Sequence, residues 1–216
     1  DTVMRLEELP QRMAILGGGF IGCEFAHVFS AYGVEVTQIH RNSVLLNHHD
    51  ADIATRFTQV AAAEWGLRLD SQIERVSKSA GGIEVRVRAA DGSSEVIEVD
   101  SLLIATGRTP NTDTLNVAAT GISTNAKGVI SVDATMATEV PGIWALGDVV
   151  HTPELKHVAN HEARVVRHNL LQDWDDTDAL MSSDHRFVPA AVFTDPQIAW
   201  VGMTENEARA KGLDIK

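Results

Sequence analysis

The sequence of 216 residues contains almost no cysteine and no long apolar run. The one cysteine, Cys23, excludes an intrachain disulfide, and so little cysteine favours a reducing, cytoplasmic location. No stretch reaches the ~18 consecutive apolar residues of a membrane-spanning helix, and the N-terminal segment lacks the apolar core of a signal peptide. We therefore expect neither a disulfide scaffold nor a membrane partner.

Positive charge is also scarce, because 18 basic residues stand against 30 acidic ones and the formal net charge is -12. Such an excess of negative charge repels phosphates at long range, so a nucleic-acid partner is not expected. The 44% hydrophobic and 22% charged residues are ordinary for a globular protein. A chain of this length can form one large domain or two small ones.

A glycine-rich segment, Gly17-Gly18-Gly19-Phe20-Ile21-Gly22, stands between two predicted elements. Arg12–Leu16 before it predicts a short strand, and the apolar residues after it recur at helical spacing up to Gly33. Val34–Ile39 then predicts a second strand. A G-x-G-x-x-G sequence in a strand-helix-strand unit is the fingerprint of a dinucleotide site in a doubly wound fold.

Each glycine of the fingerprint has an expected role. Gly17 makes the tight turn, Gly19 lets backbone amides reach a pyrophosphate, and Gly22 lets helix and strand pack closely. The amides at the helix start, near Phe20 and Ile21, then hold the diphosphate with about half a positive charge. A merely glycine-rich turn is the alternative.

The residues that end the second strand select between the two nicotinamide nucleotides. A carboxylate there accepts from the ribose of NAD and repels a 2'-phosphate, but this chain has His40-Arg41 and no acid. The guanidinium of Arg41 can meet a 2'-phosphate through a planar fork of donors. The sequence therefore predicts a preference for NADPH, with NADH also possible. An exposed arginine without a ligand is the alternative.

The remaining pattern predicts the rest of an α/β fold. A helix over residues 52–65 carries Ile53, Phe57 and Trp65 on one face and stops at Gly66. Period-two segments at residues 73–76, 83–87 and 95–99, separated by Gly81-Gly82 and Asp91-Gly92, predict an antiparallel meander. Residues 101–105 predict a buried parallel strand. The predicted fold class is a Rossmann-type doubly wound parallel sheet with an inserted antiparallel β-meander.

After Pro110 the pattern becomes irregular. We expect short strands near residues 129–132 and 143–145 and a helix over residues 157–171. Residues 188–201 predict two strands and residues 204–211 a helix, for which Thr204 and Glu207 form a capping box.

Four ordered segments together resemble one flavoenzyme family. They are the fingerprint, Ile104–Asn111 (IATGRTPN), Gly142–Asp148 (GIWALGD) and Phe193–Pro196 (FTDP). In this order the chain resembles the pyridine nucleotide-disulfide oxidoreductases, which include glutathione reductase and dihydrolipoamide dehydrogenase. Within the family, Leu155–Arg164 and Gly19-Phe20-Ile21 look most like the mycothione reductases.

The resemblance implies three domains and a longer protein. Residues 1–110 correspond to the NAD(P)-binding Rossmann domain, 111–187 to the C-terminal part of the FAD-binding domain, and 188–216 to the start of an α+β interface domain that forms a homodimer. No glycine-rich flavin loop precedes the fingerprint, so we expect the chain to be the middle of a larger flavoenzyme. The cofactors implied are FAD and NADPH.

The resemblance also implies individual site residues. Asp148, beside Gly147, corresponds to the residue that hydrogen-bonds the ribityl chain of FAD, and Glu24 to a glutamate beside the nicotinamide. Phe20 corresponds to the bulky residue that covers the flavin. The helix start at Leu155, Lys156 and His157 corresponds to backbone facing the flavin, where its dipole stabilises the anion of the reduced ring, and Thr106, Gly107 and Arg108 complete the expected cofactor contacts.

The residues that perform disulfide reduction in this family are not found in the chain. The redox cysteine pair lies upstream and the acid/base histidine-glutamate pair downstream, so no catalytic residue is expected here. Cys23, next to Gly22, is predicted to be a packing residue. His157 and His161 have i,i+4 spacing, but no third ligand is recognisable and no metal is expected.

The leading hypothesis is a segment of an FAD-dependent reductase that passes hydride from NADPH, via FAD, to a small-molecule thiol disulfide such as mycothione. By itself the chain is expected to bind nucleotide weakly and to be inactive. A dihydrolipoamide dehydrogenase-type enzyme working with NAD is the first alternative, although the absence of an acid at His40 disfavours it. A mercuric reductase, a transhydrogenase and a nonenzymatic nucleotide-binding module also remain open.

Overall fold

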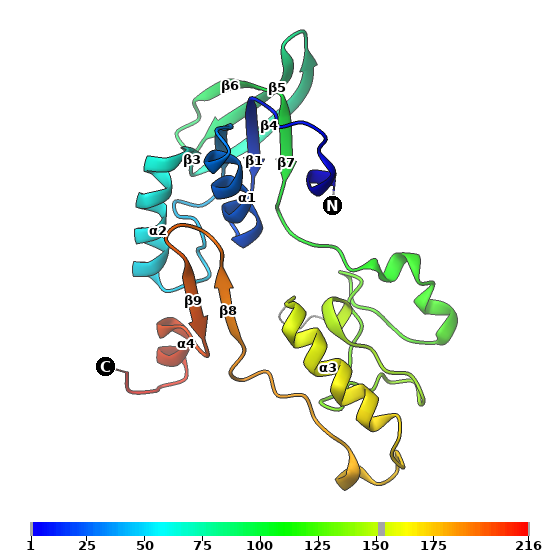
Figure 1. Ribbon diagram of the computed structural model, residues 1–216. Coiled ribbons are helices and arrows are strands. Elements are labelled where there is room, and N and C mark those ends of the chain that lie inside the picture. The colour runs from blue at the N-terminus through cyan, green and yellow to red at the C-terminus, as the bar shows by residue number, and fades with distance from the viewer. Residues whose placement is uncertain (1, 151–153, 216) are drawn as a thin grey trace. The chain divides into compact units, whose positions relative to one another are not determined.

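A computed structural model describes residues 2–150 and 154–215 of the chain. It divides into two compact units (Figure 1). The first comprises Asp1–Gly107, Ala191–Ala199 and Met203–Lys216, and the second comprises Arg108–Ala190 and Trp200–Gly202. Each unit has a core of its own, so each is described separately.

The first unit is built on a four-stranded parallel sheet. Its strand order is β3 (Gly66–Arg68), β2 (Glu35–Ile39), β1 (Arg12–Leu16) and β7 (Ser101–Ile104). Helix α1 (Phe20–Ala31) follows β1, and α2 (Ala51–Glu64) follows β2. This order confirms the predicted doubly wound fold. Strand β1 lies inside the sheet, with β2 and then β3 along one of its edges and β7 along the other.

The alternation of side chains along β1 explains the layers of this unit. Met13 and Ile15 point into a core with Phe29 of α1 and Phe57 of α2, whereas Ala14 packs in a separate core on the opposite face. That second core is completed by the antiparallel meander of β4 (Ser71–Ser79), β5 (Gly82–Ala89) and β6 (Ser94–Val99). Helices therefore cover one face of the sheet and the predicted meander covers the other (Figure 1).

The second unit is largely irregular and packs around α3 (Lys156–Asn169). Val165 and Val166 of this helix belong to one buried hydrophobic cluster with Ile130 and Met136. The 3-10 helices of the chain are η1 (Thr2–Arg5), η2 (Asn111–Thr114), η3 (Val117–Thr120), η4 (Gly147–Val150) and η5 (Thr177–Ala179).

The short strands predicted near residues 129–132 and 143–145 are wrong. Only two isolated bridges form there among the described residues, Thr124 with Ile130 and Ala137 with Trp144. The reason is local. The Asn125 side-chain oxygen accepts from the Val129 amide, and the Asp133 carboxylate accepts from the amide of Ala137, the bridge partner of Trp144. Such side-chain bonds compete with a strand ladder for backbone donors.

The predicted end of the helix before Gly66 is confirmed, since α2 ends at Glu64 with Trp65 as its C-cap, and Gly66 then begins β3, paired with Thr37. Two other expectations fail. The strand at residues 101–105 is only half-buried, since β7 is the edge strand of the described sheet and Ile104 is 67% exposed. Ile53 was placed on the buried face of α2 but is 45% exposed.

The C-terminal elements form as predicted. Strands β8 (Pro189–Val192) and β9 (Ile198–Val201) pair with each other, and α4 (Glu205–Ala210) follows. The capping box is confirmed, since the Thr204 hydroxyl accepts from the Glu207 amide while the Glu207 carboxylate accepts from the Thr204 amide at 2.8 Å. Among the helices described, none is long and apolar enough to cross a membrane.

Candidate functional site

The glycine loop lies where the carboxyl ends of β1, β2 and β7 meet. The Gly17 amide donates to the Ile39 carbonyl at 2.9 Å, and the Ala105 amide donates to the Leu16 carbonyl at 2.8 Å. Gly17 has a φ of 128°, and a Cβ on it would lie 2.3 Å from the Ala105 carbonyl oxygen. Only glycine fits this turn, which stands at the crevice where open α/β sheets bind ligands.

The three carbonyl groups of the loop are all engaged by the protein. Gly17 O accepts from Gln38 Nε2 at 2.8 Å. Gly18 O accepts from the Leu46 amide at 2.7 Å, and Gly19 O accepts from the Cys23 amide at 3.0 Å. These bonds fix the orientation of each peptide plane in the loop.

The amides that follow those carbonyls are left available. In a trans peptide the N–H points away from the carbonyl before it, so the N–H groups of Gly18, Gly19 and Phe20 face away from the groups that hold the loop. None of these three amides donates a hydrogen bond within the described part of the chain, and no side chain caps α1. Unpaired amides at a helix start are the kind of donors that an anion can accept from.

The second and third fingerprint glycines differ in their surroundings. A Cβ on Gly22 would lie 2.4 Å from Gly17 O, so the helix reaches the loop only because this residue is glycine. A Cβ on Gly19 would meet nothing within 4 Å, and its φ of -83° suits any residue. The protein itself therefore requires Gly22, whereas the space beside Gly19 stays open for a ligand.

Sequence reasoning missed Gln38, which is fully buried on β2. Its Oε1 accepts from Trp65 Nε1 at 2.9 Å, and its Nε2 donates to Gly17 O and also lies 3.6 Å from Cys23 Sγ. A glutamine within an apolar strand was the available signal, because a buried amide must find partners. Burial raises the pKa of the Cys23 thiol to about 12, so the group is a neutral thiol near pH 7.

His40 and Arg41 stand directly after β2, beside the loop. A Cβ on Gly18 would lie 2.5 Å from the His40 ring, so the ring fills the space that this glycine leaves. Burial, followed by the charge of Arg41, lowers the pKa of His40. His40 Nε2 is buried without a partner among the described residues. Arg41 is exposed, and no hydrogen bond or ion pair of the described residues involves it.

The other expected nucleotide contacts lie on α1 and after β7. Phe20 is 40% exposed at the helix start, and Ile21 is half-buried beside it. The Glu24 carboxylate accepts from the Phe193 amide at 2.9 Å, so this side chain has a partner within the first unit and is not simply a solvated helix residue. Thr106 and Gly107 are exposed at the end of β7, and Gly107 has a φ of 153°.

In the second unit, the Gly147-Asp148 turn is held by Glu162. This carboxylate is fully buried on α3. Its Oε2 accepts from the Gly147 amide at 2.6 Å, and its Oε1 lies 2.9 Å from His185 Nε2. Sequence reasoning did not assign a role to Glu162. Its spacing of four from Val158, on the apolar face of α3, was the signal for a buried partnered carboxylate.

Asp148 already has a partner, because its carboxylate pairs with Arg108. Arg108 Nε also lies 3.2 Å from the Glu154 carboxylate. Leu155 is the N-cap of α3 and provides no side-chain bond, and Lys156 and His157 at the helix start are exposed. The amides of this helix start are therefore free of a side-chain cap.

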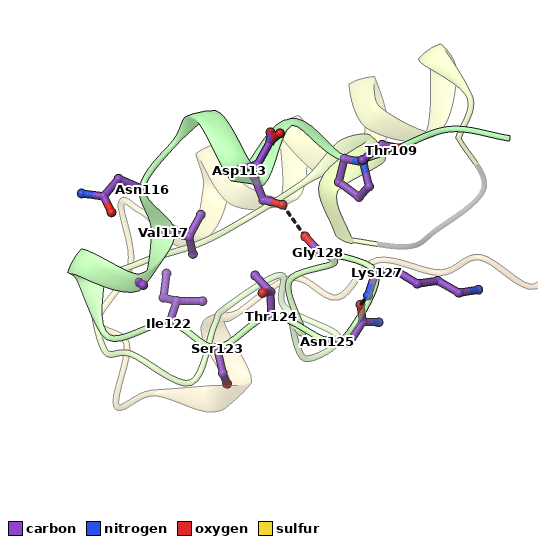
Figure 2. A pocket seen from close by; sticks show the side chains of 13 residues that line it. Thr109, Asp113, Asn116, Val117, Ile122, Ser123, Thr124, Asn125, Lys127 and Gly128 are labelled. Atoms are coloured by element: carbon purple, nitrogen blue, oxygen red, sulfur yellow. Dashed lines mark hydrogen bonds between the residues drawn. The ribbon is translucent and has the colours of Figure 1, made fainter.

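One hollow of the second unit is lined by none of the predicted cofactor residues. It has a volume of about 600 Å³ and lies in the second unit between η2, η3 and the turn at residues 125–128. Figure 2 shows Asp113, Asn116, Asn125 and Lys127 at its wall, and Thr112 Oγ1 donates to the Gly128 carbonyl across it. Among the residues that the structure describes, no three acidic, histidine or cysteine side chains gather as a metal site.

Comparisons with known proteins agree with these features. Residues 1–163 match the family described as "Pyridine nucleotide-disulphide oxidoreductase", and residues 188–216 match its dimerisation domain. The chain is 53% identical over 215 residues to mycothione reductase of Mycobacterium tuberculosis, covering 100% of this chain and 46% of that protein. It is 36% identical to a mercuric reductase of Staphylococcus aureus, covering 100% of this chain and 38% of that protein.

A solved structure has the same fold. The HOCl-induced flavoprotein disulfide reductase RclA from Escherichia coli superposes with a TM-score of 0.85 at 35% identity, covering 99% of this chain and 47% of that one. The chain thus spans less than half the length of these relatives. The matches confirm the family predicted from the four ordered segments.

Proposed function

The chain belongs to the pyridine nucleotide-disulphide oxidoreductase family, and from this we propose that it forms the NADPH-binding part of an FAD-dependent disulfide reductase. Enzymes of this family use FAD and NAD(P)H. When bound, the nicotinamide supplies a hydride and the flavin carries its electrons towards a disulfide. The residues of this chain bind and orient the two groups. The proposal includes the division into domains at residues 1–110, 111–187 and 188–216.

The observation that supports the proposal most is the glycine loop with its outward amides. The N–H groups of Gly18, Gly19 and Phe20 are unpaired within the described chain and lie at the start of α1, where the helix adds about half a positive charge. The pyrophosphate of a dinucleotide matches this arrangement in charge and in its demand for donors. The open space beside Gly19 supplies the room for its approach.

The end of β2 supports a preference for NADPH. Arg41 is exposed and has no carboxylate partner in the described chain, so its guanidinium is free to form a bidentate pair with a 2'-phosphate. Among the described side chains of this edge, His40 Nε2 is buried without a hydrogen-bond partner, which is consistent with a place that a ligand or water completes.

The residues expected to hold the flavin lie in the second unit. Glu162 fixes the backbone of the Gly147-Asp148 turn, and Arg108 fixes the Asp148 carboxylate. Asp148 can then accept from a sugar hydroxyl with its remaining lone pairs. The uncapped start of α3, at Lys156 and His157, would present amides to the ring.

The substrate belongs to the proposal as well. We infer a low-molecular-weight thiol disulfide of the mycothione type, supported by the 53% identity to mycothione reductase. We also propose a homodimer, supported by the dimerisation-domain match at residues 188–216, and a cytoplasmic location, supported by the single free cysteine. The 36% identity to mercuric reductase and the 32% identity to a dihydrolipoyl dehydrogenase from Buchnera aphidicola keep those two activities as the alternatives.

Calorimetric titration of the chain with NADPH and NADH tests the nucleotide part. A charge-assisted pair at Arg41 corresponds to roughly tenfold to hundredfold tighter binding of NADPH. Arg41→Glu should remove that preference, because it replaces the attraction for the 2'-phosphate with repulsion. Arg86→Glu on β5 makes the same charge change at another exposed residue and should keep the preference. Failure of the wild-type chain to bind either nucleotide would overturn the proposed function.

A further inference from the structure

The glycine loop of this chain is fixed from inside the protein by a buried polar relay. Trp65 Nε1 donates to Gln38 Oε1 at 2.9 Å, and Gln38 Nε2 donates to Gly17 O at 2.8 Å. Gln38 is fully buried, and Trp65 is 6% exposed. We propose that Gln38 is a positioning residue for the pyrophosphate of the nucleotide, acting through the Gly17-Gly18 peptide, and that Trp65 fixes the orientation of Gln38.

The geometry gives the amide group of Gln38 one consistent orientation. The indole N–H of Trp65 can only donate, so it selects the oxygen of the glutamine amide. The NH₂ group of Gln38 must then face Gly17, whose carbonyl can only accept. Each member of the relay thus determines the orientation of the next.

The relay reaches the ligand side through one peptide plane. Because the Gly17 carbonyl points inward to Gln38, the Gly18 N–H of the same trans peptide points to the opposite side. A glycine with a φ of 128° has few steric limits on its own conformation, so this peptide needs an external constraint to keep its orientation. The bond from Gln38 is that constraint.

Gly22 restricts the same carbonyl from the helix side. A Cβ at this position would lie 2.4 Å from Gly17 O and 3.2 Å from Gln38 Nε2. The carbonyl is therefore enclosed between α1 and the Gln38 amide. The fingerprint alone provides the close approach of the helix, whereas Gln38 provides the hydrogen bond that selects one rotation of the peptide.

This inference rests on the proposed nucleotide function and makes a narrower statement. It predicts that Gln38 affects only the part of the affinity that comes from the pyrophosphate. NADP⁺ contains both the pyrophosphate and the 2'-phosphate, whereas adenosine 2'-monophosphate contains only the latter. A ratio of the two affinities therefore separates positioning of the loop from a general loss of structure.

Gln38→Met retains the length of the side chain and removes its hydrogen bonds with Trp65 and Gly17, together with the weaker one to Cys23 Sγ. We expect NADP⁺ to bind about tenfold more weakly, as for the loss of one charge-assisted hydrogen bond. The affinity for adenosine 2'-monophosphate should change by less than about twofold. Trp65→Phe retains Gln38 and removes its donor, so NADP⁺ affinity should fall by a smaller factor, between about twofold and tenfold.

A conservative variant gives a second readout. Gln38→Glu presents a buried carboxyl group without a cationic partner, so burial raises its pKa. While protonated, it can accept from Trp65 and donate to Gly17 O as the glutamine does. NADP⁺ affinity relative to wild type should therefore recover on the acidic side and decrease as pH rises through that pKa. A Gln38 with a purely space-filling role predicts no such pH profile.

Thr194→Val is the matched control. Thr194 is 4% exposed in the same unit, and its hydroxyl donates to the Pro196 carbonyl at 2.8 Å. Its loss should lower the melting temperature without changing the ratio of the two affinities. Equal weakening of both ligands by Gln38→Met, or unchanged NADP⁺ binding in a folded Gln38→Met protein, would overturn the inference. Absence of NADP⁺ binding to the wild-type chain would instead overturn the proposed function.

Discussion

Gly22→Ala should destabilise the first unit and weaken nucleotide binding together. The added methyl would lie 2.4 Å from Gly17 O and 3.1 Å from its carbonyl carbon. Both atoms are backbone, so neither can rotate away as a flexible side chain does. Either α1 or the glycine loop must move, and in both cases the amides of Gly18 and Gly19 leave their positions at the helix start.

Two opposing effects determine how much Gly22→Ala changes the free energy of unfolding. Overpacking in a well-packed interior costs about 1–3 kcal/mol. Alanine is a better helix former than glycine by about 1 kcal/mol, and this gain offsets part of the loss. A 2.4 Å approach to a backbone atom places the overpacking cost in the upper part of its range, at about 2–3 kcal/mol. After the helix gain is subtracted, we expect the free energy of unfolding to fall by about 1–2 kcal/mol. Urea unfolding followed by circular dichroism measures this change, and calorimetry with NADPH measures the accompanying loss of affinity.

Gly19→Ala supplies the contrast within the same loop. A Cβ at this position meets nothing within 4 Å, and the φ of -83° imposes no strain. The stability should change by less than about 1 kcal/mol, which is the range for a helix N-cap. NADPH affinity should nevertheless fall, because the methyl group occupies the space of the approaching pyrophosphate. Wild-type stability of Gly22→Ala, or wild-type NADPH affinity of Gly19→Ala, would refute this reading of the loop.

Two further predictions concern buried groups. Cys23, with its pKa raised to about 12, should not react with a disulfide reagent in the native chain at pH 8 and should react after unfolding, so rapid labelling of the native chain would contradict this. Because the unfolded thiol ionises near 9.0 and the native thiol does not, the free energy of unfolding should fall as pH rises from about 9 towards 12. Glu162→Ala leaves the Gly147 amide and His185 without their acceptor, so urea unfolding should show a loss of about 2–4 kcal/mol. Glu162→Gln retains an acceptor and should lose less, and equal losses in both variants would count against the assigned bonds.

Local sequence patterns predicted the parts of the fold that depend on neighbouring residues. The glycine fingerprint lies between a strand and a helix, as predicted. It was predictable because the turn, the start of the helix and the packing of the helix on the strand depend on residues only a few positions apart. The meander followed from alternation and from Gly81-Gly82 and Asp91-Gly92 turns. The capping box at Thr204 is likewise a contact between residues three positions apart.

The features that were missed depend on partners distant in sequence. Gln38 contacts Gly17 and Trp65, which are 21 and 27 residues away, and Glu162 contacts His185 at a separation of 23. Periodicity marks such residues as polar within apolar elements but does not identify their partners. The failed strands near residues 130 and 144 have the opposite cause, since the nearby side chains of Asn125 and Asp133 take backbone donors that a ladder requires.

The amide spectrum of the ¹⁵N-labelled chain during titration with NADP⁺ tests most directly whether the start of α1 holds the pyrophosphate. We expect the largest shifts at Gly18, Gly19 and Phe20, whose N–H groups have no acceptor within the described chain. A smaller set should appear around His40 and Arg41. Shifts confined to other parts of the chain, or no shifts at saturating NADP⁺, would contradict the claim that the start of α1 holds the pyrophosphate.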